Sequence, residues 1–233
     1  MITVQPIVYT ADTGAWHTLA TDLGLTAAFP PGPVWAEFDG RGVLAVHGVD
    51  PEDPHRDRTD LHLLAEDLGA AEAALTAAGF DVVHTPLADV GDMLRVVSTS
   101  GVAVTVSQGE RSARSGPMAV LPIWYADDLD EPGRLLTALG LRPRISSESG
   151  GWHDFVAPGG GLVALHTGTA RVDLAFEFAA DLDELAGRLV AAGHPAVVLD
   201  EAYNRTVRFA GPDDREIWVN EVQTDLYGFR EHA

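Results

Sequence analysis

The stretch Trp152–His166, WHDFVAPGGGLVALH, reads as two short strands joined by a glycine-rich turn. Large and small residues alternate over Trp152–Val156, the turn lies at Pro158–Gly161, and Leu162–His166 is an apolar run that ends on a histidine. The same order of residue types occurs earlier in the chain, at Trp35–His47, as WAEFDGRGVLAVH. The sequence therefore predicts two equivalent β-hairpins.

The residues around the two hairpins also repeat. The pair Asp60-Leu61 returns as Asp173-Leu174, and LTAAG at Leu75–Gly79 returns as LVAAG at Leu189–Gly193. A repeat of roughly 115 residues that fills almost the whole chain indicates a duplicated domain and not a solenoid of short units. We therefore predict a first domain over 1–108, a linker over 109–117, a second domain over 118–224 and a polar tail over 225–233.

Composition and charge argue against several classes of protein. A hydrophobic fraction of 46% suits two globular cores. The sequence has no apolar run long enough to span a membrane, no basic region before its first apolar residues, and no cysteine. The net charge of −20, with every basic residue an arginine, argues against nucleic acid and anionic membranes as partners. We expect a cytoplasmic protein.

The secondary structure expected from the sequence is α+β, with the order β-α-β-β-β occurring twice in each half. Capping residues and glycines predict four helices, over Thr13–Leu23, Leu68–Ala78, Glu131–Leu139 and Asp183–Ala192. Besides the two hairpins, β-branched and aromatic residues predict strands over Thr3–Thr10, Leu25–Phe29, Asp60–Ala65, Phe80–His84, Leu94–Ser98, Val102–Ser107, Val120–Tyr125 and Val172–Phe178, and near Val197, Val207 and Ile217.

Four βαβββ modules in two pairs resemble the vicinal oxygen chelate superfamily, which contains glyoxalases, bleomycin-resistance proteins and extradiol dioxygenases. The resemblance covers nearly all of both domains. It rests on the Leu-Gly and Ala-Ala-Gly helix ends, on DLDEL at Asp181–Leu185 after a strand, and on GPDD at Gly211–Asp214 before the final strand. It implies that the two modules of each domain curl into a half-barrel around a cavity for a small molecule.

The resemblance also implies where metal-dependent relatives hold their ligands, and this chain departs from the pattern there. The positions hold Gln5, Ala45, Asp60 and Thr105 in the first domain, and Val120 or Leu121, Ala164, Asp173 and Trp218 in the second. A catalytic divalent site needs three or four converging nitrogen or oxygen ligands. We therefore expect no metal site of the family's kind and no cofactor. An atypical site formed by His47, Asp60 and His62 is the alternative.

The inward-facing positions implied by this register predict a mixed aromatic and polar pocket. The ligand-binding candidates are His47, Trp124, Trp152, His153, His166, Asp173, Glu177, Trp218 and Asn220. The tryptophans Trp35, Trp124 and Trp152 also fit structural roles in their strands. Carboxylates at Asp60, Asp173 and Glu177 would favour a cationic or hydrogen-bond-donating ligand. We expect the main pocket in the second domain or where the domains meet, with Trp218 on its wall.

Two functions fit these residues. The first is a metal-independent binding protein of the bleomycin-resistance kind, which holds a small organic molecule such as a natural product. The second is a glyoxalase-like lyase, isomerase or cyclase that uses either an atypical metal site or an acid–base pair, Asp60 with His62 or Glu177 with His166. Because the second domain can complete the cavity within one chain, we expect a monomer or a weak homodimer.

Overall fold

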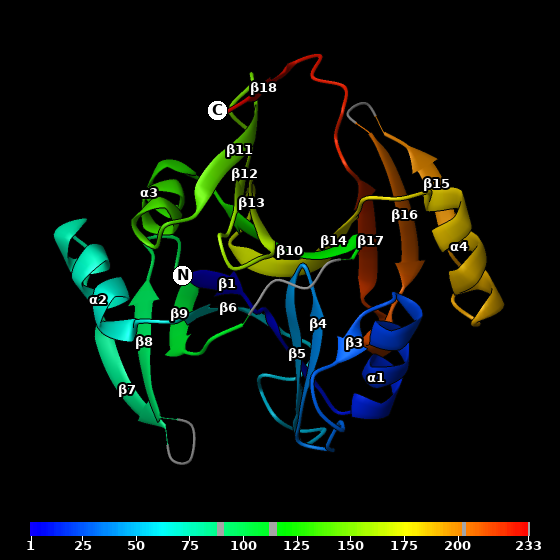
Figure 1. The fold of residues 1–233 in the computed structure, drawn as a ribbon, viewed down its shortest axis with the longest axis horizontal. Coiled ribbons are helices and arrows are strands. Elements are labelled where there is room, and N and C mark those ends of the chain that lie inside the picture. Colours follow the sequence, from blue (N-terminus) through cyan, green and yellow to red (C-terminus); the bar gives the residue numbers. More distant parts are fainter. Residues whose placement is uncertain (88–90, 112–115, 202–203, 233) are drawn as a thin grey trace.

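The computed structural model describes residues 1–87, 91–111, 116–201 and 204–232, and it divides into two similar halves (Figure 1). The N-terminal half contains β1 (Ile2–Val4), β2 (Ile7–Thr10), α1 (Thr13–Asp22), β3 (Thr26–Ala27), β4 (Trp35–Gly40), β5 (Gly42–Gly48), β6 (Thr59–Ala65), α2 (Leu68–Ala77), β7 (Val83–Leu87), β8 (Gly91–Val97) and β9 (Ala103–Gln108). The C-terminal half contains β10 (Met118–Ala126), α3 (Asp130–Ala138), β11 (Arg142–Ser147), β12 (Trp152–Val156), β13 (Leu162–Thr167), β14 (Arg171–Phe178), α4 (Leu182–Ala191), β15 (Val197–Asp200), β16 (Arg205–Ala210), the 3-10 turn η1 (Pro212–Asp214), β17 (Glu216–Glu221) and β18 (Phe229–Glu231).

Each half is built on one nine-stranded sheet that does not close into a barrel. The strand order is β3-β4-β5-β2-β6-β9-β8-β7 in the first sheet, with β1 paired to β6, and β15-β16-β17-β14-β10-β13-β12-β11-β18 in the second. The predicted α+β class with two equivalent halves is confirmed. No helix among the described residues is long and apolar enough to cross a membrane.

The helices begin and end where their capping residues predict. Asp12 and Asp67 accept hydrogen bonds from the backbone N–H groups of Ala15 and Ala70, which lie in the first turns of α1 and α2, at 2.9 and 2.8 Å. Each of the four helices is followed by a glycine with positive φ, at positions Gly24, Gly79, Gly140 and Gly193. The predicted helix ranges are therefore correct to within one residue at each end.

Several local predictions were wrong. The strand expected over Leu94–Ser98 begins at Gly91, the one expected over Leu25–Phe29 is only Thr26–Ala27, and β11 was not predicted. The expected strand Thr3–Thr10 is broken between β1 and β2 at Gln5-Pro6, where proline has no N–H to donate to the sheet. The strand expected over Phe80–His84 begins three residues later, at Val83. The expected tail contains β18, which pairs with β11. Of the expected linker 109–117, residues 112–115 lie outside the described residues, as does residue 233 of the tail.

The two hairpins of the repeat join the halves through their turns. The N–H of Val4 donates to the carbonyl of Gly160, and the N–H of Gly159 donates to that of Ile2, at 3.0 and 2.7 Å. In the same way, the N–H of Arg41 donates to the carbonyl of Met118 at 2.9 Å. Gly42 and Gly161 meet between the halves, and a Cβ at Gly42 would lie 2.9 Å from the Cα of Gly161. The glycine turns are thus required by the contact between halves as well as by hairpin geometry.

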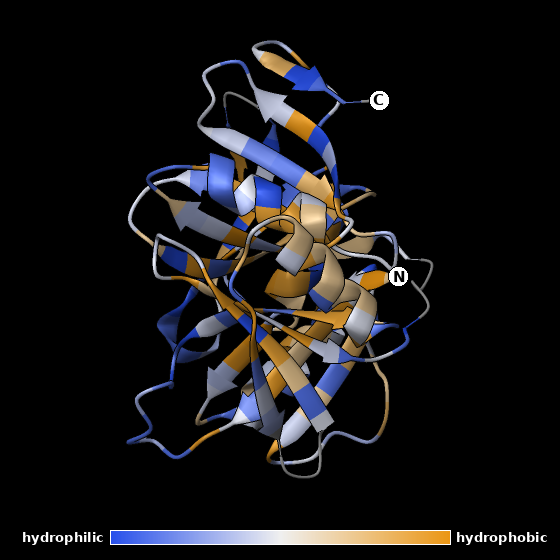
Figure 2. Ribbon diagram, turned by 90° about the vertical axis from the view of Figure 1, so that its left-hand side faces the viewer, coloured by the Kyte–Doolittle hydropathy of each residue, from blue (hydrophilic) through white to orange (hydrophobic). Residues whose placement is uncertain are grey.

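The hydrophobic core lies between the helices and the sheets, and it runs from one half into the other (Figure 2). Orange, hydrophobic segments gather in the interior in Figure 2, whereas loops and strand ends are blue. Trp16 on α1 and Trp124 on β10 are completely buried in this core. The opposite faces of both sheets are left to line a cavity.

Candidate functional site

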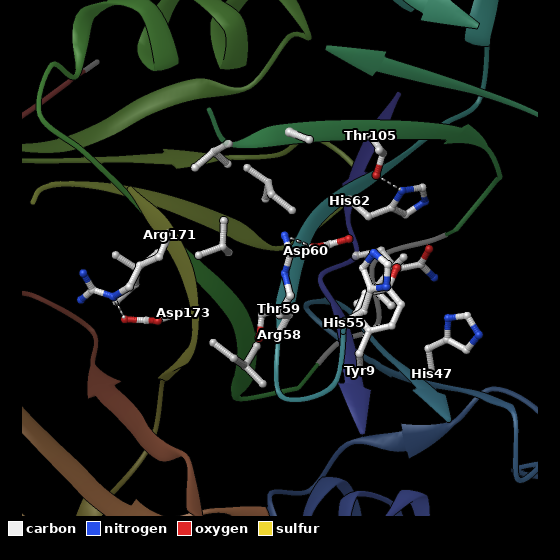
Figure 3. Close-up of a pocket in the computed structure, with 18 of the residues that line it drawn as sticks. Tyr9, His47, His55, Arg58, Thr59, Asp60, His62, Thr105, Arg171 and Asp173 are labelled. Atoms are coloured by element: carbon white, nitrogen blue, oxygen red, sulfur yellow. Dashed lines mark hydrogen bonds and ion pairs between the residues drawn. The ribbon is translucent and has the colours of Figure 1, made fainter. Parts of the chain in front are cut away.

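One cavity of about 1520 Å³ is lined by residues from both halves of the molecule. Figure 3 shows Tyr9, His47 and His62 on one side of the β6 residues Thr59 and Asp60, and Arg171 with Asp173 on the other. This volume exceeds the 300–1000 Å³ typical of small-molecule pockets. It has room for a large organic ligand or for two smaller ones.

A cluster of tyrosine, histidine and tryptophan occurs at the same place in each half. His47 lies between Tyr9 and Trp35, with ring centroids 5.1 and 5.6 Å away, and it meets Trp35 edge-on at 76°. In the other half His166 lies between Tyr125 and Trp152 at 5.2 and 5.9 Å, with an edge-on angle of 78°. Identical strand register produces this match, because Tyr9 and Trp35 pair with His47 as Tyr125 and Trp152 pair with His166.

A row of polar side chains runs from Gln5, between β1 and β2, across the strands β6, β9 and β8 of the N-terminal half. The N–H of Gln5 donates to the carbonyl of His62 at 3.0 Å, His62 pairs with Thr105, and Thr105 pairs with Arg95. The Nδ1 atom of His62 lies 2.8 Å from the Thr105 hydroxyl (Figure 3). Gln5 is 2% exposed, and its Nε2 is a buried donor with no partner among the described residues. We call these four residues the polar row.

Burial controls the charge states beside the polar row. Desolvation lowers the pKa of His62 to about 4, so its imidazole is neutral at pH 7. Burial, together with the negative charge of Asp60 and a hydrogen bond to it, raises the pKa of Tyr9 to about 12. Desolvation also lowers the pKa of His47. The inner face therefore presents neutral imidazoles and a phenol at physiological pH.

The equivalent row in the C-terminal half is apolar. Ala175 pairs with Leu121 on one side and with Trp218 on the other, and Arg208 pairs with Trp218. The inner face of this half is a cluster of buried small and aliphatic residues: Ala119, Leu121, Ile123, Leu162, Ala164 and Ala175. Four partly buried residues pack against this cluster: Tyr125, Trp152, Val156 and Trp218.

A buried ion network takes up the polar residues beyond this apolar row. Arg144 lies 2.6 Å from a carboxylate oxygen of Asp154 and 2.6 Å from one of Glu177, and both carboxylates are almost fully buried. Arg41, from the other half, lies 3.4 Å from Glu177. Although burial alone lowers the pKa of Arg144, its hydrogen bonds to Asp154 and Glu177 raise it above its ordinary value. These groups neutralise one another and are not presented to the cavity.

The structure places most of the predicted site residues at the cavity and separates others from it. His47, Asp60, His62, Trp152, His166, Asp173 and Trp218 line the cavity. Trp124 does not, because its neighbours Ile123 and Tyr125 face inward and the alternation of a strand directs Trp124 into the core. His153 lines a separate groove beside α3, Asn220 accepts a hydrogen bond from Thr206, and Glu177 belongs to the ion network.

Neither predicted acid–base pair is in direct contact. Glu177 and His166 pair with Ala119 and Tyr125 of β10, which are six residues apart, or roughly 20 Å along a strand. Asp60 and His62 occupy successive inward positions of β6, roughly 7 Å apart. Each of these two has its own hydroxyl partner, Tyr9 for Asp60 and Thr105 for His62.

The residues present do not fit a divalent metal site. The register places His62, and not Asp60 as the resemblance implied, beside Gln5 and Thr105. This set supplies one imidazole, one carboxamide and one hydroxyl, with no anionic ligand, whereas the equivalent positions in the other half are Leu121, Ala175 and Trp218. Among the described residues, no three His, Cys, Asp or Glu side chains are grouped closely enough to hold a metal ion. The expected alternative site of His47, Asp60 and His62 is therefore wrong.

Several cavity residues escaped the sequence analysis. Tyr9 and Tyr125 could have been found, because Ile7-Val8-Tyr9 and Ile123-Trp124-Tyr125 occupy the same place in the two repeats. Arg171 stacks on Tyr125, with its guanidinium carbon 3.6 Å from the ring centroid, and lies 2.8 Å from Asp173. Arg95 also lines the cavity, and a cross-strand pairing that the sequence does not reveal brings it beside Thr105.

Comparison with curated proteins finds one distant relative. No family model matches the sequence. Protein DesVIII of Streptomyces venezuelae is 28% identical over 92% of this chain. The match covers 64% of DesVIII, so the chain spans less than two thirds of that protein's length.

Solved structures resemble the whole chain in fold. The Mn(II)-bound glyoxalase of Novosphingobium aromaticivorans matches with a TM-score of 0.66 and 18% identity, over 98% of this chain and 82% of that one. The 2,3-dioxygenase LapB of Pseudomonas sp. KL28 matches with a TM-score of 0.65 and 14% identity, over 97% and 92% of the two chains. A catechol 2,3-dioxygenase matches with a TM-score of 0.62 and 13% identity, over 95% and 92%. The chain thus has the two-domain fold of this glyoxalase and these dioxygenases.

Proposed function

We propose that this protein binds a small organic molecule in the cavity between its two halves without a metal ion, as a binding protein of the bleomycin-resistance kind. The observation that carries the proposal is the lining of the cavity. Two clusters of tyrosine, histidine and tryptophan provide aromatic faces, and the polar row provides a few fixed hydrogen-bonding groups. Rigid aromatic surface with a small number of convergent polar groups is the usual composition of an organic-ligand site.

The absence of a fitting ligand set supports the metal-independent part of the proposal. The two equivalent strand positions hold His62 and Ala175, flanked by Gln5 and Thr105 in one half and by Leu121 and Trp218 in the other. A divalent cation at either row would face no carboxylate and only one imidazole. The cytoplasmic location and the monomeric or weakly dimeric state belong to the same proposal.

A second function, a lyase, isomerase or cyclase, is favoured by one observation. Asp60 and His62 occupy successive inward positions of one strand, and Tyr9 and Thr105 orient them separately. Asp60 could remove a proton from a bound ligand and return it to another atom of the same molecule, which needs no co-reactant. A buried, neutral His62 could donate or accept a hydrogen bond at the developing charge.

Identification of a co-purified molecule tests the binding function. The purified protein is denatured, the released compounds are identified by mass spectrometry, and the candidate is returned to ligand-free protein while the melting temperature is followed. A specific ligand raises that temperature by mass action. Ala175→Phe, which narrows the cavity from the C-terminal half, should lower the affinity.

The same experiment separates the two functions. Recovery of the ligand unchanged after long incubation supports a binding protein. Formation of a product that is lost in an Asp60→Asn variant which still binds would establish the enzyme instead. Stoichiometric, tightly held zinc, iron, manganese or nickel in the purified protein would contradict metal independence.

A further inference from the structure

The charges around the cavity are almost all neutralised by partners within the protein. Five carboxylates line it, and among the described residues each has an arginine within 4 Å. These pairs are Glu37–Arg111, Asp57–Arg56, Asp60–Arg58, Asp173–Arg171 and Glu216–Arg208. The acidic residues that suggested a cationic ligand from the sequence are thus already paired. Their charge gives a cationic ligand little to bind.

The unpaired charge in the cavity is positive. Of the four arginines that line it, Arg58 and Arg171 are paired with carboxylates. Arg215, like Arg95, has no carboxylate within 4 Å among the described residues, but it donates to the Thr59 hydroxyl and the Tyr9 carbonyl at 2.8 and 3.0 Å. Arg95 lines the cavity and is exposed, with no carboxylate partner among the described residues. An arginine without a carboxylate is notable in a chain with 35 acidic and 15 basic residues.

Arg95 lies at one end of a row that contains several hydrogen-bond donors. At the other end, Gln5 has a buried Nε2 with no partner among the described residues. Between them, the Thr105 hydroxyl can donate to Nδ1 of His62, which then carries its proton on Nε2. An amide N–H, an imidazole N–H and a guanidinium would then converge from neighbouring strands on one face of the sheet.

We infer that the polar row binds the carboxylate of an organic acid, with Arg95 as its charged partner and Gln5 and His62 as neutral donors. A carboxylate accepts hydrogen bonds only, so it satisfies all three groups, and its planar oxygens match the arginine fork. The row contains one cation and therefore balances one negative charge. Ile7 and Tyr9 continue along the same face from Gln5, and with His47 they provide an apolar and aromatic wall for the body of the acid. This inference rests on the proposed binding function and specifies its ligand class.

Three probes of the same size and different charge test the inference. Benzoate, benzamide and benzamidine are anionic, neutral and cationic versions of one ring, and their dissociation constants can be measured by ligand-observed NMR. We expect benzoate to bind most tightly and benzamidine most weakly. Arg95→Leu should weaken benzoate by about tenfold or more, the range for losing a charge-assisted hydrogen bond, and should leave benzamide nearly unchanged.

The molecule provides a matched control for Arg95. Arg208 occupies the equivalent strand position in the other half, but it lies over the Trp218 ring and beside Glu216. The double variant Arg208→Leu with Glu216→Gln, which removes both members of that pair, should therefore leave the benzoate affinity unchanged. Gln5→Leu should weaken benzoate by a smaller factor than Arg95→Leu. The ¹⁵N resonance of His62 Nε2 should shift when benzoate is added, which a purely structural role of the histidine would not produce.

The outcomes separate this inference from the binding function on which it rests. If benzamide or benzamidine binds as tightly as benzoate, or if Arg95→Leu has no effect, the carboxylate assignment is overturned while ring binding in the cavity survives. If phenyl phosphate binds more tightly than benzoate, the single-charge assignment is overturned. If none of the probes binds at millimolar concentration, both the inference and the proposed function are overturned.

Discussion

The two halves of this protein have the same fold but carry side chains of different polarity at equivalent strand positions. At equivalent strand positions the N-terminal half holds Gln5, His62, Thr105 and Arg95, and the C-terminal half holds Leu121, Ala175, Trp218 and Arg208. The first row contains a buried donor, Gln5 Nε2, with no partner among the described residues, whereas the second has apolar residues up to Arg208, which is paired with Glu216. The comparison shows that Gln5 Nε2 in one row has no partner among the described residues, while Arg208 and the Arg144 network of the other half are paired with carboxylates.

The largest expected effect is on the buried ion network of the C-terminal half. Arg144→Ala leaves Asp154 and Glu177 buried without their main partner, which should lower the free energy of unfolding by about 3–5 kcal/mol. Urea denaturation measures this change. Arg171→Ala is the control, since it removes an exposed pair with Asp173 and should cost at most about 1 kcal/mol. Equal losses in the two variants would show that the network is not structural.

The pH dependence of stability should reveal the buried histidine of the polar row. The pKa of His62 falls from 6.5 to about 4 on folding, so below pH 6.5 the unfolded chain binds the proton more readily than the folded protein. The stabilisation by neutral His62 is present above pH 6.5 and is lost as the pH falls toward 4. Relative to His62→Gln, which cannot titrate, the wild type should lose roughly 3 kcal/mol between pH 7 and pH 4. Chemical denaturation at each pH checks this difference, and a gap independent of pH would show that folding does not lower the pKa of His62.

The aromatic wall of the C-terminal half should contribute moderately to ligand affinity. Trp218→Ala removes a large apolar surface from the cavity and should cost roughly 1–3 kcal/mol in binding free energy. Binding to the wild type should also quench tryptophan fluorescence. Trp124→Phe is the control, because Trp124 lies in the core and its replacement should change stability without changing affinity. An unchanged affinity in Trp218→Ala would place the ligand wholly in the N-terminal half.

The smallest expected effect is on the free energy of unfolding when the unpartnered side-chain amide of Gln5 is removed. Gln5 is buried with an unpartnered donor, and its counterpart in the other half is Leu121. Gln5→Leu should therefore be neutral or stabilise the protein by up to about 1 kcal/mol, because it removes a buried donor that has no partner. Thermal unfolding of the ligand-free protein measures the change. A marked loss of stability would mean that the Gln5 amide has a structural partner within the protein and does not serve to bind a ligand.

The local elements of the fold could be predicted because their signals are short-range. Asp12 caps α1 and Gly24 follows it, and the Trp-to-His hairpins occur twice in the same order. The break at Gln5-Pro6 and the pairing of β18 were missed. The break at Gln5-Pro6 depends on which backbone N–H groups donate to the neighbouring strand. The pairing of β18 depends on a contact between residues far apart in the chain.

The candidate site was predicted in part. The positions of His47, Asp60, His62 and Trp218 at a cavity were expected from the register that the resemblance implied, combined with strand alternation. The assignment of Glu177 as an acid–base residue failed, because its partner Arg144 comes from another strand and Arg41 from the other half of the molecule. A carboxylate looks the same in the sequence whether it is free or paired.

The sequence by itself determined the duplication and the α+β modules, since these depend on residue order and residue type. The tertiary structure alone decided which polar groups are neutralised and which are free. It placed Gln5, His62, Thr105 and Arg95 in one row, and it paired each cavity carboxylate with an arginine. The physical reason is that electrostatic interactions act over a few ångströms in space and depend on burial, and neither quantity can be read from distance along the chain.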